Sequence, residues 1–157
     1  MKKLAILLFM GVFIAACGGG SSDKPAANSE TPAETTTTGN PSYDPERGEG
    51  KFKDVAIAEN LDATMAAAGE KVYTVKCVSC HKLTSEKLVG PGWMGVTDRH
   101  TAAWIMNFTT NTDAMLNKDP KAQAQLEICL VRMPNQNIAD DDARNLYEFM
   151  RKNDGIK

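Results

Sequence analysis

Three features are scarce in this 157-residue sequence, and each scarcity excludes something. Basic residues are not in excess, because 18 Lys and Arg face 20 Asp and Glu, and this balance argues against nucleic-acid binding. No apolar run reaches the roughly 20 residues that a membrane-spanning helix needs. Aromatic residues make up only 6% of the chain, so the side chains alone build a modest core. The four cysteines could form two disulfides, bind a metal or have separate roles.

The first 16 residues have the pattern of an export signal. Lys2 and Lys3 precede an apolar run that ends at residue 16. The small residues before Cys17 resemble the bacterial lipobox, which implies cleavage before Cys17 and lipidation of its thiol, palmitate included. An ordinary signal peptide with a free thiol at Cys17 is the alternative. Several acyl chains would anchor the protein to a bacterial membrane with its remainder in the periplasm. Gly18 follows Cys17, so the acidic residue that would retain a lipoprotein in the inner membrane is not seen. The outer membrane is therefore compatible with the sequence, but the choice of membrane stays open.

Residues 17–53 are predicted to be the lipidated cysteine and a flexible tether. The stretch 18–50 is rich in Gly, Ser, Thr, Pro and Glu, and Tyr43 is its single aromatic residue. Such a composition buries too little apolar surface to offset the entropy of ordering. The predicted globular domain is therefore 54–157.

The globular domain is predicted to be all-α, because no long run alternates apolar and polar residues as a strand would. Residues that favour the start of a helix are Asp62, Thr101, Asp119 before Pro120, and the acidic run that begins at Asp140. The predicted helices are 61–76, 101–108, 120 to about 131, and one that starts at 140. The stretches 82–99 and 132–139 are predicted loops. A domain of this size with so much loop would gain from a cofactor in its core.

The sequence Cys77-Val78-Ser79-Cys80-His81 is a CxxCH motif, the attachment pattern of c-type haem. Two thiols at this spacing can reach the two vinyl groups of one porphyrin, and the adjacent His81 can then bind the iron. One covalent haem c is the predicted cofactor. The other uses of a CxxC pair fit less well. A thioredoxin-like dithiol calls for a βαβ pattern, which is absent, and a zinc site needs a second ligand pair, for which only His100 and Cys129 remain.

These features together make the chain resemble the class I monohaem cytochromes c. Gly69, Val72 and Tyr73 precede the motif, and Gly90-Pro91, Met133-Pro134 and a terminal helix with Leu146, Tyr147 and Phe149 follow it. The resemblance implies an all-α cytochrome c fold of about four to five helices packed around one haem. It also implies that the first and last helices cross at Gly69, near Tyr147.

The resemblance implies His/Met ligation of the iron, with His81 as the proximal ligand. Met133 is the expected sixth ligand, because it lies in a loop just before the last helix. Met94 and His100 are the alternatives, whereas Met106 and Met150 fall on apolar helix faces and Met115 lies in a polar stretch. By the same resemblance, the Pro91 carbonyl oxygen accepts a hydrogen bond from His81 Nδ1 and orients its ring.

With both axial positions filled by protein, the iron could only change its oxidation state. The predicted function is therefore a one-electron carrier, not an enzyme, that shuttles electrons between exported or membrane-bound redox proteins. It is expected to be monomeric and not to bind nucleic acid. The alternative is a peroxidase-like or gas-binding haem protein with an open sixth position.

The roles of several other side chains stay open at this stage. Lys76, Lys82 and Lys87 flank the motif and either guide partners or are ordinary solvated lysines. Trp93 and Trp104 either reach a haem propionate through their indole N–H or only pack in the core. Cys129 is either a buried inert thiol or the site of an intermolecular disulfide.

Overall fold

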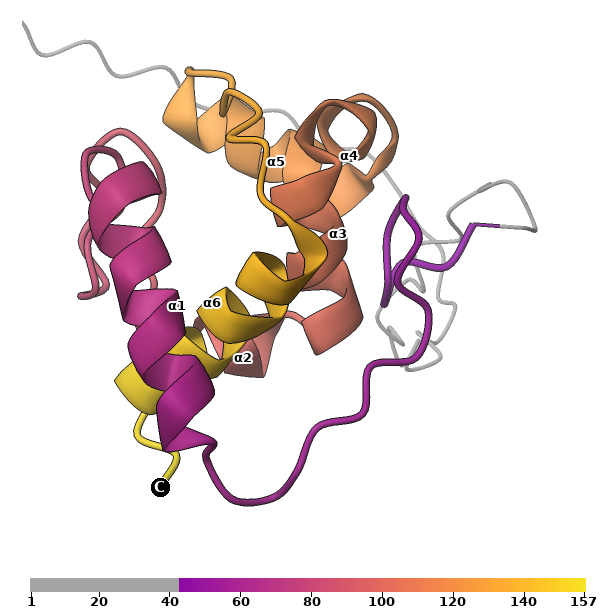
Figure 1. Cartoon of the computed structure of the whole chain (residues 1–157). Helices are drawn as coiled ribbons and strands as arrows, with labels where there is room; N and C mark the ends of the chain where they lie inside the picture. The colour runs from indigo at the N-terminus through magenta and orange to yellow at the C-terminus, as the bar shows by residue number, and fades with distance from the viewer. Residues whose placement is uncertain (1–42) are drawn as a thin grey trace, which may run out of the picture. The chain divides into compact units, whose positions relative to one another are not determined.

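The computed structural model describes residues 43–157, in which six helices and no strand are found (Figure 1). The helices in chain order are α1 (Ala63–Lys76), α2 (Val96–Arg99), α3 (Ala102–Thr110), α4 (Thr112–Lys118), α5 (Pro120–Cys129) and α6 (Asp140–Asn153). The all-α prediction is thereby confirmed for this part of the chain. The predicted signal peptide, Cys17 and the tether up to residue 42 lie outside the described residues. None of the helices within 43–157 is long and apolar enough to cross a membrane.

Side-chain caps start the helices where the sequence predicted. The Asp62 carboxylate accepts hydrogen bonds from the backbone N–H groups of Thr64 and Met65, both at 2.9 Å. Thr101 caps α3, and Asp119 caps α5 with Pro120 in the first turn. Each cap satisfies backbone donors that the helix itself leaves without a partner.

Two helices were not predicted. Helix α2 is a single turn inside a predicted loop, and α4 follows α3 after Asn111. Neither helix has a side-chain cap, in contrast to α1, α3 and α5. Helix α5 ends at Cys129 rather than near 131, because Leu130 takes the left-handed conformation with φ 61°.

Helices α1 and α6 pack across each other, and α3 also packs on α6 (Figure 1). Gly69 lies at the crossing, where a Cβ atom would come within 2.0 Å of the Asn145 backbone oxygen. The predicted close approach is therefore present, one to two residues before Tyr147. Only a residue without a side chain lets the two backbones come this close.

The segment before α1 does not match the predicted tether. Residues 43–57, here called the strap, lie along α3 and α4 with defined hydrogen bonds. Fully buried Asn107 accepts from the backbone N–H of Phe52 at 2.9 Å and donates to the carbonyl oxygens of Arg47 and Phe52, both at 2.8 Å. The Tyr43 hydroxyl donates to the Asp119 carboxylate. The described part of the predicted tether, 43–53, is thus packed on the domain, where one buried amide on α3 satisfies three of its backbone polar groups.

Candidate functional site

The CxxCH motif forms the turn that follows α1. The backbone N–H groups of Cys80 and His81 both donate to the Cys77 carbonyl oxygen at 3.0 Å. The Tyr73 hydroxyl, on the last turns of α1, donates to the His81 carbonyl oxygen at 2.7 Å. Tyr73 is itself held between the rings of Trp93 and Phe149, at centroid distances of 5.0 and 5.4 Å. The aromatic core therefore fixes the turn that carries both thiols and the imidazole.

The His81 ring is oriented by the loop that follows the motif. Its Nδ1 lies 2.9 Å from the Pro91 carbonyl oxygen, the contact that the family resemblance implied. A carbonyl oxygen can only accept, so Nδ1 carries the proton and the lone pair is on Nε2. Burial lowers the pKa of His81 below its usual 6.5, although the bond to Pro91 opposes this shift. The ring is therefore neutral at pH 7, with a free Nε2 suited to bind a metal.

The two motif cysteines differ in their surroundings. Cys77 is only 6% exposed, and burial raises the pKa of its thiol to about 11, against a smaller opposite effect of Lys76. Cys80 is partly buried and lines the cavity described next. The Cys77 thiol is therefore protonated at pH 7, whereas a zinc ligand would be a thiolate. Among residues 43–157, no group of three His, Cys, Asp or Glu side chains could hold a metal ion, so the zinc alternative lacks a set of donors.

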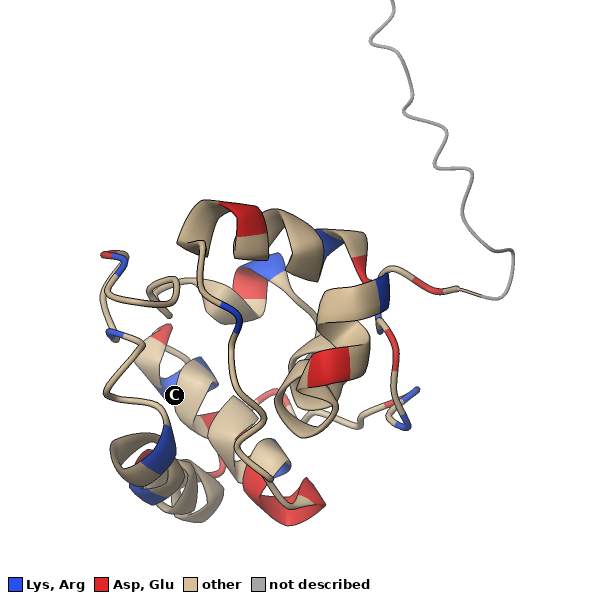
Figure 2. Ribbon diagram, turned by 90° about the horizontal axis from the view of Figure 1, so that it is seen from above, with Lys and Arg blue, Asp and Glu red and all other residues tan. Residues whose placement is uncertain are grey.

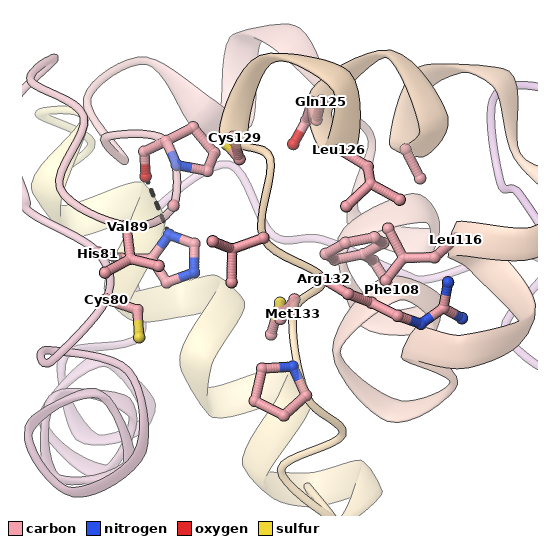
Figure 3. Close-up of a pocket in the computed structure, with 15 residues that line it drawn as sticks. Cys80, His81, Val89, Phe108, Leu116, Gln125, Leu126, Cys129, Arg132 and Met133 are labelled. Carbon is pink, nitrogen blue, oxygen red and sulfur yellow. Dashed lines mark hydrogen bonds between the residues drawn. The ribbon is translucent and has the colours of Figure 1, made fainter.

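A mainly apolar cavity opens beside His81 in two adjoining parts, of about 90 and 310 Å³. Both parts are lined by His81, Pro91, Phe108, Gln125 and Met133. Figure 3 shows Met133, from the segment after α5, lying across the cavity from the His81 ring. An imidazole and a thioether are thus presented to one apolar space, with Cys80 of the motif in its wall. This donor set suits a c-type haem.

His100 also lines the larger part of the cavity, but the other methionines are placed less favourably than Met133. Met94 is 52% exposed and lines neither part of the cavity. Met106 is buried in the core away from the cavity, as predicted. Met115 is fully buried, and its sulfur accepts from the Glu49 backbone N–H at 3.0 Å. Met150 is buried in the core on α6 and contributes to the wall of the larger part.

The loop that carries Met133 is held by side chains rather than by backbone pairing. The Arg132 guanidinium donates to the Asp113 carbonyl oxygen at 3.2 Å and to the Asn117 side chain at 3.0 Å. The Lys76 ammonium donates to the Gln136 carbonyl oxygen at 2.9 Å. These contacts connect the loop to α4 on one side and to the end of α1 on the other.

The flanking lysines all have partners within the chain. Besides Lys76, Lys82 pairs with Glu86 at 2.8 Å, and Lys87 donates to the Ile128 carbonyl oxygen at 3.0 Å. Figure 2 shows basic and acidic residues interspersed along the ribbon. The partners of Lys76 and Lys87 lie 60 and 41 residues away along the chain, so no local sequence pattern indicates them.

The structure also narrows the open roles of Trp104 and Cys129. The Trp104 indole N–H donates to the buried Asp119 carboxylate at 3.1 Å and is therefore not directed at a propionate. Trp93 is buried, with its ring tilted against His81 at a centroid distance of 5.5 Å. Cys129 is a partly buried free thiol and lines the smaller part of the cavity. Its position in the sequence indicated an apolar helix face but not a place beside the cavity.

Replacing Gly90 with alanine is expected to tilt the His81 ring. A Cβ atom at this position would lie 2.4 Å from Cε1 and 2.8 Å from Nδ1 of the imidazole, so the ring must move. The expected loss of stability is about 1–3 kcal/mol, measured by denaturant unfolding of the haem-loaded protein. Leu88→Ala is the control, because Leu88 is 46% exposed and lines neither part of the cavity. It should change stability by less than about 0.5 kcal/mol. Equal stability of the Gly90→Ala variant and the parent would contradict the crowding.

Known proteins agree with this geometry. The family model for cytochrome c matches residues 66–154. A cytochrome c from Rhodothermus marinus is similar in structure, with a TM-score of 0.64 and 28% identity over 67% of this chain and 90% of that one. Two structures of one engineered form of a Rhodothermus marinus cytochrome c match with TM-scores of 0.67 and 0.64, each at 28% identity over 71% of this chain and 98% of that one. One of these is bound to a carbene intermediate.

No curated protein is significantly similar to the chain. The match over more than half of its length shows that the chain belongs to the cytochrome c family, whose members bind a c-type haem covalently.

Proposed function

We propose that this protein is a one-electron carrier whose haem is joined to Cys77 and Cys80 and ligated by His81 and Met133. The observation that carries the proposal is the cavity, lined on one side by a neutral imidazole and on the other by a thioether. When bound, haem supplies an iron that changes between Fe(II) and Fe(III). The cytochrome c family is mainly a family of electron-transfer proteins, which supports the same conclusion.

The chain's own residues have three tasks in this proposal. The Pro91 carbonyl oxygen keeps the proton on His81 Nδ1, so that Nε2 stays free for the iron. The Met133 thioether is a soft ligand that favours Fe(II) and so raises the reduction potential. Apolar neighbours such as Phe108 and Leu126 keep water from the cavity. A low-dielectric environment of this kind disfavours the more highly charged ferric state.

The location of the protein remains a proposal that rests on the first 53 residues. We propose export, lipidation at Cys17 and attachment to a bacterial membrane, with the haem domain in the periplasm. Redox proteins outside the cytoplasm would then be the electron donor and acceptor.

Substitution of Met133 by alanine tests the proposed ligation. The parent protein should show a sulfur-to-iron charge-transfer band when oxidised and should not bind carbon monoxide rapidly when reduced. The variant should lose the band and bind carbon monoxide on mixing. Its potential should fall by on the order of 0.1 V, a small part of the ~0.8 V range that axial ligands give to haem proteins.

Met94→Ala is the matched control, because Met94 is exposed and should leave the spectrum unchanged. Retention of the band in Met133→Ala would contradict the assignment of Met133. Rapid, tight binding of carbon monoxide by the reduced parent protein would favour the open-site haem protein instead of the carrier.

A further inference from the structure

Asp119 is a fully buried carboxylate directly behind the wall of the cavity in the candidate site. It caps α5, and it accepts hydrogen bonds from the Trp104 indole N–H at 3.1 Å, from the backbone N–H of Ala122 at 2.7 Å and from the Tyr43 hydroxyl. Trp104 lines the larger part of the cavity and Ala122 lines the smaller part. The carboxylate is therefore bonded directly to residues in the walls of both parts.

The hydrogen bonds of Asp119 match its ionised form. Both of its oxygens face donors, so neither is placed to hold a proton that would itself need an acceptor. Burial and the hydrogen bond to Asp119 raise the pKa of Tyr43, so the phenol keeps its proton and donates it. Hydrogen bonds to the charged form of a carboxyl group favour that form. Asp119 therefore places a negative charge inside the protein.

No side-chain cation neutralises this charge. Within residues 43–157, Asp119 forms no salt bridge. Lys121, two positions further along the chain, pairs with Glu46 at 2.9 Å instead. The N-terminus of α5 offers only a partial positive charge, equivalent to roughly half an elementary charge. Part of the negative charge of Asp119 therefore stays uncompensated.

The imidazole of His100, in the wall of the larger part of the cavity, does not compensate the charge either. Burial lowers the pKa of His100 to about 4, and the positive charges of Lys121 and Arg99 add to this effect. Asp119 and Glu46 act in the opposite direction. The ring is therefore neutral at pH 7, and the field of Asp119 reaches the wall of the cavity.

We propose that Asp119 is a fixed negative charge that stabilises the ferric state of the haem and so lowers the reduction potential of the carrier. The inference rests on the proposed function, because it takes the cavity to be the haem site. Fe(III) carries one more positive charge than Fe(II), so a negative charge nearby favours it. Water and salt screen a buried charge far less than an exposed one. The apolar lining and the Met133 thioether act in the opposite direction, and Asp119 sets the potential below the value that they alone would give.

The Asp119→Asn variant tests this role, since it removes the charge and keeps a side chain that caps helices equally well. The ratio of oxidised to reduced haem-loaded protein at a fixed potential should fall at least threefold, equal to about 30 mV for a one-electron couple. The difference from the parent should persist in about 1 M salt, where exposed charges are screened beyond about 3 Å. Glu127→Gln is the control, because Glu127 is exposed on the same helix and lines neither part of the cavity. It should leave the ratio unchanged.

A second variant, Tyr43→Phe, separates the charge from the packing around it. It removes one hydrogen bond to the carboxylate and loosens the same contact between the strap and α5, but it leaves the charge in place. The ratio of oxidised to reduced protein should therefore stay the same or rise, because a less neutralised carboxylate favours Fe(III) more.

An unchanged or higher ratio in Asp119→Asn, or a fall of similar size in both variants, would overturn the proposal. The second result would mean that loosened packing, and not the lost charge, shifts the potential. The sulfur-to-iron band of the parent tests the ligation by Met133 separately, because the charge of Asp119 acts on a haem in this cavity whichever residue is the sixth ligand.

Discussion

Replacing Glu148 with alanine is expected to lower the free energy of unfolding by about 3–5 kcal/mol. The Glu148 side chain is fully buried on α6 and accepts hydrogen bonds from Arg144 and Arg151, both at 2.6 Å. It also accepts from the backbone N–H of Asp62, the capping residue of α1, at 2.9 Å. Without the carboxylate, the buried guanidinium of Arg151 would keep only the carbonyl oxygens of Ala58 and Glu59, and the Asp62 N–H at the start of α1 would lose its acceptor. Removing one member of a buried ion pair leaves an uncompensated charge, which is why the expected loss is large.

Denaturant unfolding of the haem-loaded protein gives the measurement, read as a lower midpoint at an unchanged slope. The matched control is Glu70→Ala, which removes the exposed pair between Glu70 and Lys152 at 3.0 Å. Exposed pairs contribute about 0–1 kcal/mol, so this variant should remain close to the parent. If Glu148→Ala costs no more than Glu70→Ala, then the buried carboxylate does not hold α1 against α6.

The helices that could be predicted from the sequence are those with local start signals. Asp62 and the Asp119-Pro120 pair fix the first turns of α1 and α5, and these signals need only a few neighbouring residues. Helix α4 begins after Asn111, but the Asn111 side chain does not cap it and donates to the Glu49 carbonyl oxygen instead. Its Met115 and Leu116 are buried by packing against other elements, which a local pattern of polar and apolar residues does not reveal.

The same distinction between local and distant contacts applies to the strap. The composition of its first part, 43–53, predicts a flexible tether, because this part is rich in Gly and charged residues and poor in large apolar ones. It is ordered by Asn107, which lies 55 residues from Phe52 along the chain. A single buried amide with three backbone partners has no signature in the sequence.

Within the candidate site, the motif residues could be predicted because Cys77, Cys80 and His81 are neighbours in the chain. Met133 was predicted as the sixth ligand because the motifs follow one another in the same order as in a known family. The pairing of His100 with Gln125 joins residues 25 positions apart, and only the fold brings them together. The burial of Glu148 was missed for a related reason, since a single glutamate among the polar residues of α6 is ordinarily solvent-facing.

Replacing Gly69 with alanine is expected to lower the free energy of unfolding by about 3 kcal/mol or more, because α1 and α6 could no longer cross at their present distance. The new Cβ atom would lie 2.0 Å from the backbone oxygen and 2.5 Å from the carbonyl carbon of Asn145. These are backbone atoms of α6, so no side-chain rotation relieves the overlap. Alanine also favours the helix by about 1 kcal/mol over glycine, so a net loss of stability would measure the crossing itself.

The effect should extend to the haem site, since the turn after α1 carries Cys77, Cys80 and His81. Moving α1 away from α6 would shift these residues relative to Met133, which belongs to the loop before α6. We therefore expect Gly69→Ala to weaken the sulfur-to-iron band in addition to lowering the unfolding midpoint. Ala67→Gly is the control, because Ala67 is exposed on the same helix and should cost only about 1 kcal/mol without a spectral change. A Gly69→Ala variant as stable as the parent, with an unchanged band, would show that the crossing tolerates a side chain and does not set the geometry of the site.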